Sequence, residues 1–155
     1  MLDDAVRILD ANRIMAISTV RPDGWPQTTI VGYANDGLQI YFMIFRASQK
    51  FANIEKDDRV SFAVGAEPTD VGNITAVYSS AHACEVTEVA ERDRAWNLLA
   101  KRHPNLRDFI PPPQSETAMM RASCEHLSVL DYTKGFGHTE AMIADNDATW
   151  THPLS

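Results

Sequence analysis

The chain has 155 residues, of which 45% are hydrophobic and 23% charged, and its formal net charge is −7 at pH 7. This length suits one globular domain, and the composition excludes disordered, collagen-like and disulfide-scaffold proteins. No apolar run approaches the roughly 20 residues of a membrane-spanning helix, and no basic block is available for nucleic-acid phosphates. We therefore expect a cytoplasmic protein that binds neither membrane nor nucleic acid.

The first third of the chain predicts a short helix and then an antiparallel meander. Leu2, Val6 and Leu9 share one face of a helix over residues 2–11. Two turn signals, at residues 22–24 and 35–37, end in Asp-Gly, and glycine readily adopts the positive φ that hairpin turns require. The predicted strands on either side of these turns span residues 14–20, 27–34 and 38–44.

The rest of the chain alternates short helices and strands. Helices are expected at residues 47–57 and 91–103, and strands at residues 59–64, 73–89 (one long strand or two) and 126–132. Prolines make residues 109–113 a stiff surface connection, and the residues after 132 show no clear period.

These elements predict an α+β fold, mainly β. The expected architecture is a Greek-key-like barrel of six or so antiparallel strands with short flanking helices. Closing the sheet removes the exposed edges that an open meander would leave. Residues 1–155 then form a single domain, with a core at about residues 10–135 and a C-terminal tail at residues 136–155.

A cluster of hydrogen-bond donors lies at residues 46–50, where the third strand gives way to the second helix. The free amides of a helix start favour an anion, and Arg46, Ser48 and Lys50 add two cations and a hydroxyl that suit a phosphate. The alternative is structural, with Ser48 as a helix N-cap and Lys50 as a solvated surface residue. The residues alone leave both interpretations open.

Several motifs extend this cluster into a longer pattern. They are Asp23-Gly24-Trp25-Pro26, Asp36-Gly37, Ser48-Gln49-Lys50, Arg59-Val60-Ser61 and Ala83-Cys84-Glu85-Val86. In this order and at this spacing, over about residues 10–135, the chain resembles the pyridoxamine 5′-phosphate oxidase-like family of flavin-binding split β-barrels.

The resemblance implies FMN as the cofactor and gives roles to named residues. Thr29, Ile30 and Val31 would run along the ring system, Met43 and Ile44 would lie beneath the ribityl chain or ring edge, and Ser48, Gln49 and Lys50 would surround the phosphate, with Arg46 as a further cation. The true oxidases have a phosphate-binding arginine where Thr29 stands and a hydroxyl-bearing residue where Ile44 stands. Two donors of the family pattern are therefore missing.

The tail also departs from the true oxidases, in which C-terminal basic and aromatic residues hold the substrate phosphate. Here Lys134, Phe136 and His138 surround two glycines. They either line a substrate pocket or belong to a glycine-rich turn in which Phe136 caps the core. Turnover of pyridoxamine phosphate is therefore not expected.

The resemblance implies an FMN-dependent oxidoreductase that acts as a homodimer, with two flavins between its subunits and a small-molecule substrate or electron donor. Because the flavin carries out the electron transfer, no catalytic side chain is predicted. The alternative is a non-catalytic protein that binds flavin, deazaflavin or haem, for instance in a stress response.

The remaining candidates indicate structure. The five histidines lack HExxH or HxxxH spacing, so no metal site is expected. Cys84 is predicted to be packed and Cys124 is left open, and neither shows a local basic cluster that would lower its thiol pKa. Trp150 is expected to be a core or interface residue, in a tail that is either disordered or packed on a partner subunit.

Overall fold

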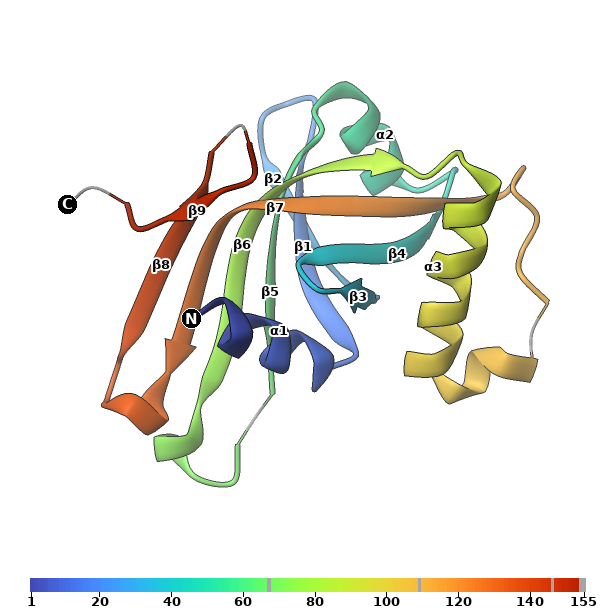
Figure 1. Ribbon diagram of the computed structural model, residues 1–155. Helices are drawn as coiled ribbons and strands as arrows, with labels where there is room; N and C mark the ends of the chain where they lie inside the picture. Colours follow the sequence, from blue (N-terminus) through green and yellow to red (C-terminus); the bar gives the residue numbers. More distant parts are fainter. Residues whose placement is uncertain (67, 109, 146, 154–155) are drawn as a thin grey trace.

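The computed structural model describes residues 1–66, 68–108, 110–145 and 147–153, and its strands form one antiparallel sheet that curls into a split barrel (Figure 1). The strands are β1 Ile14–Val20, β2 Pro26–Gly32, β3 Ala34–Asp36, β4 Gln39–Phe45, β5 Arg59–Gly65, β6 Thr75–Glu85, β7 Thr117–Asp131, β8 Thr139–Ala144 and β9 Trp150–Thr151. The helices are α1 Leu2–Asp10, α2 Gln49–Lys56 and α3 Val89–Arg102, with short 3₁₀ helices η1 Val71–Asn73, η2 Pro104–Asp108 and η3 Tyr132–Lys134. The predicted α+β, mainly β fold class is confirmed.

The two predicted hairpin turns are present. Gly24 and Gly37 have φ angles of 87° and 58°, in the region that favours glycine. β1 and β2 pair over their full length. The second predicted strand, however, ends at Gly32, and the separate short strand β3 pairs with β4. Tyr33 lies between β2 and β3, where its buried hydroxyl donates to the carbonyl of Leu9 at 2.6 Å.

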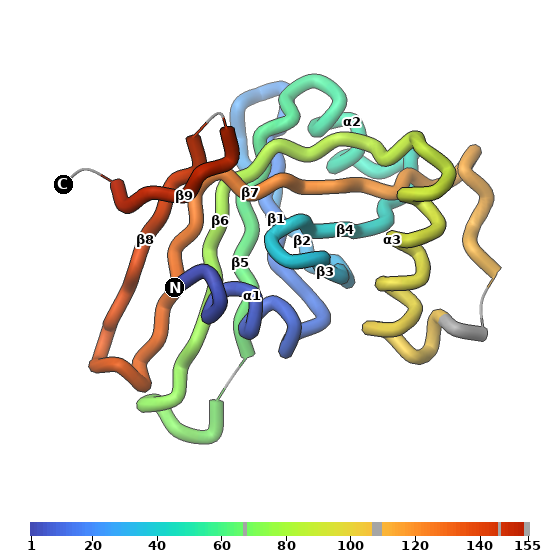
Figure 2. The backbone as a smooth tube through the Cα atoms, in the orientation of Figure 1, coloured from blue at the N-terminus to red at the C-terminus, as the bar shows by residue number. Residues whose placement is uncertain are grey.

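The longest strand, β7, organises the sheet, whose order is β2–β1–β5–β6–β7–β4–β3 with β8 also on β7. β6 follows one edge of β7, whereas β4 pairs with residues 117–123 and β8 with residues 126–130 on the other. A register shift opposite Ser80 and Ala81 leaves Glu125 as an extra residue, which is a β-bulge. Figure 2 shows β6 and β7 changing direction together along their length.

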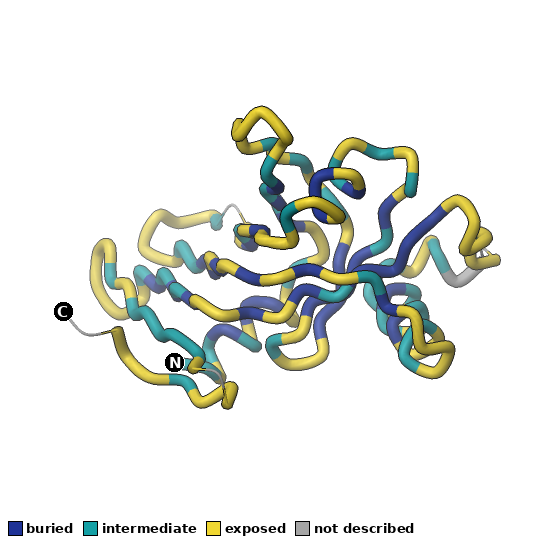
Figure 3. The backbone as a smooth tube through the Cα atoms, turned by 90° about the horizontal axis from the view of Figure 1, so that it is seen from above, coloured by how far each residue is buried: buried dark blue, intermediate teal, exposed yellow. Residues whose placement is uncertain are grey.

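The core lies inside the curl of the sheet and under α1. The central strands alternate buried and exposed residues (Figure 3), as expected when one face of an antiparallel sheet packs on the core. α1 adds its buried face, Ala5, Ile8 and Leu9. No helix in the described ranges is both long and apolar enough to cross a membrane.

β7 begins at Thr117, well before the predicted start at residue 126. Residues 117–120 are all buried, because Ala118 and Met120 face the main core while Met119 faces a second cluster under α3. A strand buried on both faces shows no alternation, so the sequence pattern concealed it. Phe109, in the predicted surface connection, lies outside the described residues.

Cys84 is exposed and Cys124 is buried, so the prediction that Cys84 is packed is wrong. Ala83 takes the inward position on β6, and the next residue therefore points to the opposite face. There, Arg121 of β7 lies directly across the ladder and donates from Nη2 to the Cys84 sulfur at 3.4 Å. The basic neighbour is on another strand, where local sequence does not reveal it.

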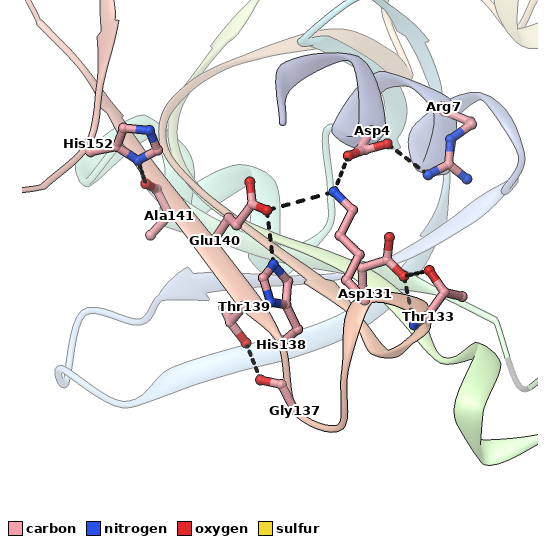
Figure 4. Close-up of polar contacts among 11 residues, drawn as sticks. Asp4, Arg7, Asp131, Thr133, Gly137, His138, Thr139, Glu140, Ala141 and His152 are labelled. Atoms are coloured by element: carbon pink, nitrogen blue, oxygen red, sulfur yellow. Dashed lines mark hydrogen bonds and ion pairs between the residues drawn. The ribbon is translucent and has the colours of Figure 1, made fainter.

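The predicted aperiodic tail forms β8, β9 and a polar cluster that holds α1, shown in Figure 4. The ammonium of Lys134 lies 2.9 Å from Asp4 and 3.7 Å from Glu140, and His138 Nε2 lies 2.9 Å from the same Glu140 oxygen. Trp150 packs against the main core of its own chain, in agreement with the expected core position, and the ordered strands β8 and β9 correct the expectation of a disordered tail. The tail therefore fastens the first helix to the barrel.

We predict that Asp4→Asn lowers stability in a pH-dependent way. The hydrogen bond from Lys134, with a smaller contribution from Arg7, lowers the pKa of Asp4 from 3.8 to about 2. The carboxylate thus stabilises the fold above its unfolded pKa, and this contribution is lost as the pH falls through about 2. Urea midpoints of wild type and variant should differ at pH 6 and converge between pH 4 and pH 2.

Asp3→Asn is the matched control, because Asp3 is an exposed neighbour in the same first turn of α1. It also removes a charge from the helix start but not the contact with Lys134. A difference in urea midpoint that does not change with pH, or that is equally large for Asp3→Asn, would contradict the stabilising role of the Asp4–Lys134 contact.

Candidate functional site

An apolar cleft of about 550 Å³ lies between β4 and the α3–η2 segment. Figure 1 shows α3 standing beside the β3–β4 end of the barrel. The lining residues are Gly32, Met43, Ile44, Phe45, Trp96, Leu99, His103, Asn105, Leu106, Ile110, Pro112 and Thr117. A concave, largely apolar site with a few polar groups, in this size range, is typical of small-molecule pockets.

The alternation of β4 builds one wall of this cleft. Ile40, Phe42 and Ile44 belong to the main core, whereas Tyr41 and Met43 face the second cluster under α3. α3 contributes Ala95 and Leu99 to that cluster. Met43 and Ile44, both predicted to contact the cofactor, point to opposite faces of β4, and yet both contribute to the lining of the cleft.

His103 is the titratable side chain of the cleft lining, and Gly32 makes room for it. The imidazole Nε2 lies 2.9 Å from the carbonyl oxygen of Tyr33, so it donates a hydrogen bond there. A Cβ atom at position 32 would lie only 3.1 Å from His103 Cε1. Glycine at the end of β2 thus allows the ring to lie against the strand.

Arg46 acts as a tether in this structure. Its two terminal nitrogens donate to both carboxylate oxygens of Glu85, at 2.7 and 2.9 Å, and its Nε donates to the carbonyl of Gln114 at 2.6 Å. The guanidinium also lies over the ring of Phe51. The Arg46 contact lowers the pKa of Glu85. Arg46 therefore joins β4 to β6 and to the segment before β7, instead of presenting a free cation.

Ser48 caps α2, as the structural interpretation proposed. Its hydroxyl donates to the carbonyl of Phe45 at 2.6 Å and accepts from the amide of Phe51 at 3.3 Å. Gln49 donates to the side chain of Asn53 at 2.8 Å. Lys50 forms no hydrogen bond or ion pair with the residues that the structure describes. The amides of Gln49 and Lys50, in the first helical turn, also lack intrahelical partners.

Asn53 holds α2 in place, a role that was not predicted from the sequence. Its side chain is fully buried and donates to Thr19 Oγ1 at 3.0 Å and to Gln27 Oε1 at 3.1 Å. One polar residue on a short helix gives no sequence signal that it faces the barrel. The network fixes the start of α2 relative to β1 and β2.

The three predicted residues of β2 do not line the cleft of their own chain. Thr29 points inward with its hydroxyl oxygen buried and without a hydrogen-bond partner in the described part of the chain. Val31 packs on the main core, whereas Ile30 is 65% exposed on the opposite face. Their contact with a flavin stays a prediction.

Lys134, Phe136 and His138 lie outside the lining of the cleft as well. Lys134 and His138 belong to the polar cluster beside α1, and Phe136 is 87% exposed with its ring centroid 4.9 Å from that of Tyr132. Their participation in a substrate pocket stays a prediction.

Comparison with known proteins identifies the family of this chain. A family model described as pyridoxamine 5′-phosphate oxidase matches residues 1–130. The chain belongs to the pyridoxamine 5′-phosphate oxidase family. None of the curated proteins matches it in sequence.

Solved structures of this family's fold carry different ligand descriptions. The chain is similar to a haem-binding protein of Mycobacterium smegmatis, with 16% identity and a TM-score of 0.77 over 92% of this chain and 58% of that one. It is similar to the haem storage protein HutZ of Vibrio cholerae, with 14% identity and a TM-score of 0.66 over 79% and 89% of the two chains. An FAD-binding protein of Mesorhizobium loti gives 19% identity and a TM-score of 0.66 over 83% and 91%.

We predict that Asn53→Ala lowers the free energy of unfolding by about 1–3 kcal/mol, because Thr19 and Gln27 lose a buried partner. Urea denaturation followed by circular dichroism measures the difference. Asn97→Ala, at an exposed position of α3, is the control for replacing asparagine by alanine in a helix. Equal stability of the two variants would contradict the positioning role of Asn53.

Proposed function

We propose that the protein is an FMN-dependent oxidoreductase whose flavin ring occupies the cleft and whose phosphate lies at the start of α2. The observation that carries this proposal is the continuity between the two. Phe45 lines the cleft, and its carbonyl accepts the hydrogen bond of Ser48, the N-cap of α2. The cleft therefore offers an apolar surface to the flavin ring, and the start of α2, a few residues further along the chain, offers hydrogen-bond donors to its phosphate.

The residues present fit the cofactor with roles that differ in part from the predicted ones. Lys50 and the amides of Gln49 and Lys50 would hold the phosphate, since a lysine and a helix start both favour an anion. Arg46, Ser48 and Asn53 would position these groups. Met43, Ile44 and Phe45 would exclude water from one side of the ring.

The bound flavin supplies the electron transfer, and the chain supplies orientation and a dry surface. Leu99 and Trp96 of α3 form the wall opposite β4, so a ring in the cleft is enclosed by two elements. The two free cysteines, one of them exposed, suit a reducing cytoplasmic location. The substrate or electron donor would approach along the open side of the cleft.

We further propose that the protein is a homodimer. Ile14, Ile30 and Tyr78 are 57%, 65% and 46% exposed, and they surround one shallow apolar depression on the outer face of β1, β2, β5 and β6. Exposed apolar patches of this kind are typical of interaction sites. A second copy covering this face would also bring two Ile30 side chains into the vicinity of the interface.

Haem is the second candidate ligand of the same cleft. His103 supplies an imidazole in an apolar wall, and imidazole is one of the side-chain groups that hold haem iron. The similar proteins from Mycobacterium smegmatis and Vibrio cholerae are described as haem-binding and haem storage proteins. Absorbance spectra of the protein titrated with FMN and with haemin separate the two ligands. Anaerobic reduction of the FMN complex by a nicotinamide cofactor then separates an oxidoreductase from a binding protein.

We predict that Lys50→Ala weakens FMN binding by about 10- to 150-fold, the effect of losing a charge-assisted hydrogen bond. Fluorescence titration of the apoprotein measures the dissociation constant. Lys56→Ala removes the same charge from the last turn of α2 and should change it little. Unchanged affinity in Lys50→Ala would remove this lysine from the site.

The wild-type protein is predicted to be a dimer at micromolar concentration, and Ile30→Glu is expected to give a monomer because it introduces a charge into the apolar patch. Light scattering after size-exclusion chromatography measures the mass. Val89→Glu is the control, since Val89 is equally apolar and exposed but lies on α3. A monomeric wild type that still binds FMN would refute the proposed dimer.

A further inference from the structure

A second, smaller hollow of about 290 Å³ adjoins the cleft. Met43 and Trp96 line both, so these two side chains form the partition between them. The other lining residues of the hollow are Arg92, Asp93, Asn97, Pro111 and Met119. The lining of the cleft is largely apolar, whereas the hollow contains the charged groups of Arg92 and Asp93. The two together suit a molecule with an apolar part and a polar part.

Arg92 has an unusual environment in this hollow. Every other arginine with a described side chain, apart from Arg13, forms an ion pair. Arg13 is exposed to solvent, but Arg92 is partly buried, and its Nε is buried without a hydrogen-bond partner among the described residues. A buried donor without an acceptor destabilises a protein, so such a group calls for an explanation.

The nearby carboxylates do not supply that acceptor. Glu85 feels the charge of Arg92, but both of its oxygens are bonded to Arg46. Asp93 lies in the lining of the hollow and is exposed, and no ion pair joins it to Arg92 in the described structure. In the described structure the Arg92 side chain thus forms no hydrogen bond or ion pair, and its guanidinium lies in the lining of the hollow, where it can bind a group that enters. Carboxylates and phosphates match the planar donor geometry of a guanidinium.

We propose that Arg92 binds the anionic group of the substrate or electron donor, a molecule whose apolar body carries a carboxylate or a phosphate. This inference rests on the proposed function, because it places the apolar part of that molecule in the cleft, beside the flavin. Trp96 and Met43 would contact the molecule between its two ends. The hollow is distinct from the start of α2, where the flavin phosphate is placed, so the two anions have separate cations.

The test uses three probes of one shape: 1-naphthoate, 1-naphthyl phosphate and the neutral 1-naphthamide. Calorimetric titrations are carried out on the protein with and without saturating FMN. We expect at least one of the two anions to bind wild type about tenfold or more tightly than the amide, as a charge-assisted contact implies. The anion that binds more tightly shows whether the site prefers a carboxylate or a phosphate.

Arg92→Gln should abolish this preference for an anion, and Arg92→Lys should retain part of it. Lys101→Gln is the matched control, because it removes one positive charge from an exposed position of the same helix. Thermal unfolding of each variant confirms that it is folded. Equal binding of acid, phosphate and amide by wild type, or a preference that survives in Arg92→Gln, would overturn the proposal.

The two proposals fail separately. If FMN does not bind but the Arg92-dependent preference is present, the flavin assignment is wrong and the anion site stands. If FMN binds and the preference is absent, Arg92 is not a binding residue. An equal loss in Lys101→Gln would show a general effect of charge and would also overturn the role of Arg92.

Discussion

A β-strand has only two hydrogen-bonding edges, and β7 must pair with three strands. It resolves this by giving one edge to β6 and dividing the other between β4 and β8. The division falls at the bulge of Glu125, where the strand bends. The β4 part carries the apolar cleft, and the β8 part carries the polar cluster that holds α1. The bend therefore separates the cofactor residues predicted near β4 from the pocket residues predicted in the tail.

Most polar side chains close to the cleft have a structural role, which is to hold the start of α2 against β4 and the barrel. Arg46 is bonded to Glu85 and Gln114, Ser48 caps α2, and Asn53 anchors that helix to the barrel. Losing any of these contacts would displace the start of α2 relative to Phe45. Lys50, by contrast, is a predicted cation that makes no such contact within the described part of the chain. A cofactor site here depends on a scaffold of satisfied hydrogen bonds around a few unsatisfied donors.

The sequence predicted the fold class, the two glycine turns and the three helices, because these depend on local spacing and on positive φ. It also predicted a cofactor site at Met43, Ile44 and the start of α2, which the structure places at and beside one cleft. It concealed the first half of β7, where both faces are buried, and the tail strands, whose pairing depends on distant partners. The neighbour of Cys84 and the anchoring role of Asn53 likewise arise from pairing between strands and helices far apart in the chain. No pattern within a short window contains that information.

The cluster that joins Asp4 to Lys134, together with the packing of Trp150, has a consequence for the order of events during synthesis. α1 is made before every strand of the barrel, but its ion-pair partner is added 130 residues later. Contacts between such distant residues form slowly, because a long loop must close. The apolar face of α1 packs on β3, β5 and β6, which are made before Lys134, so the helix can dock on the barrel before its ion-pair partner is available.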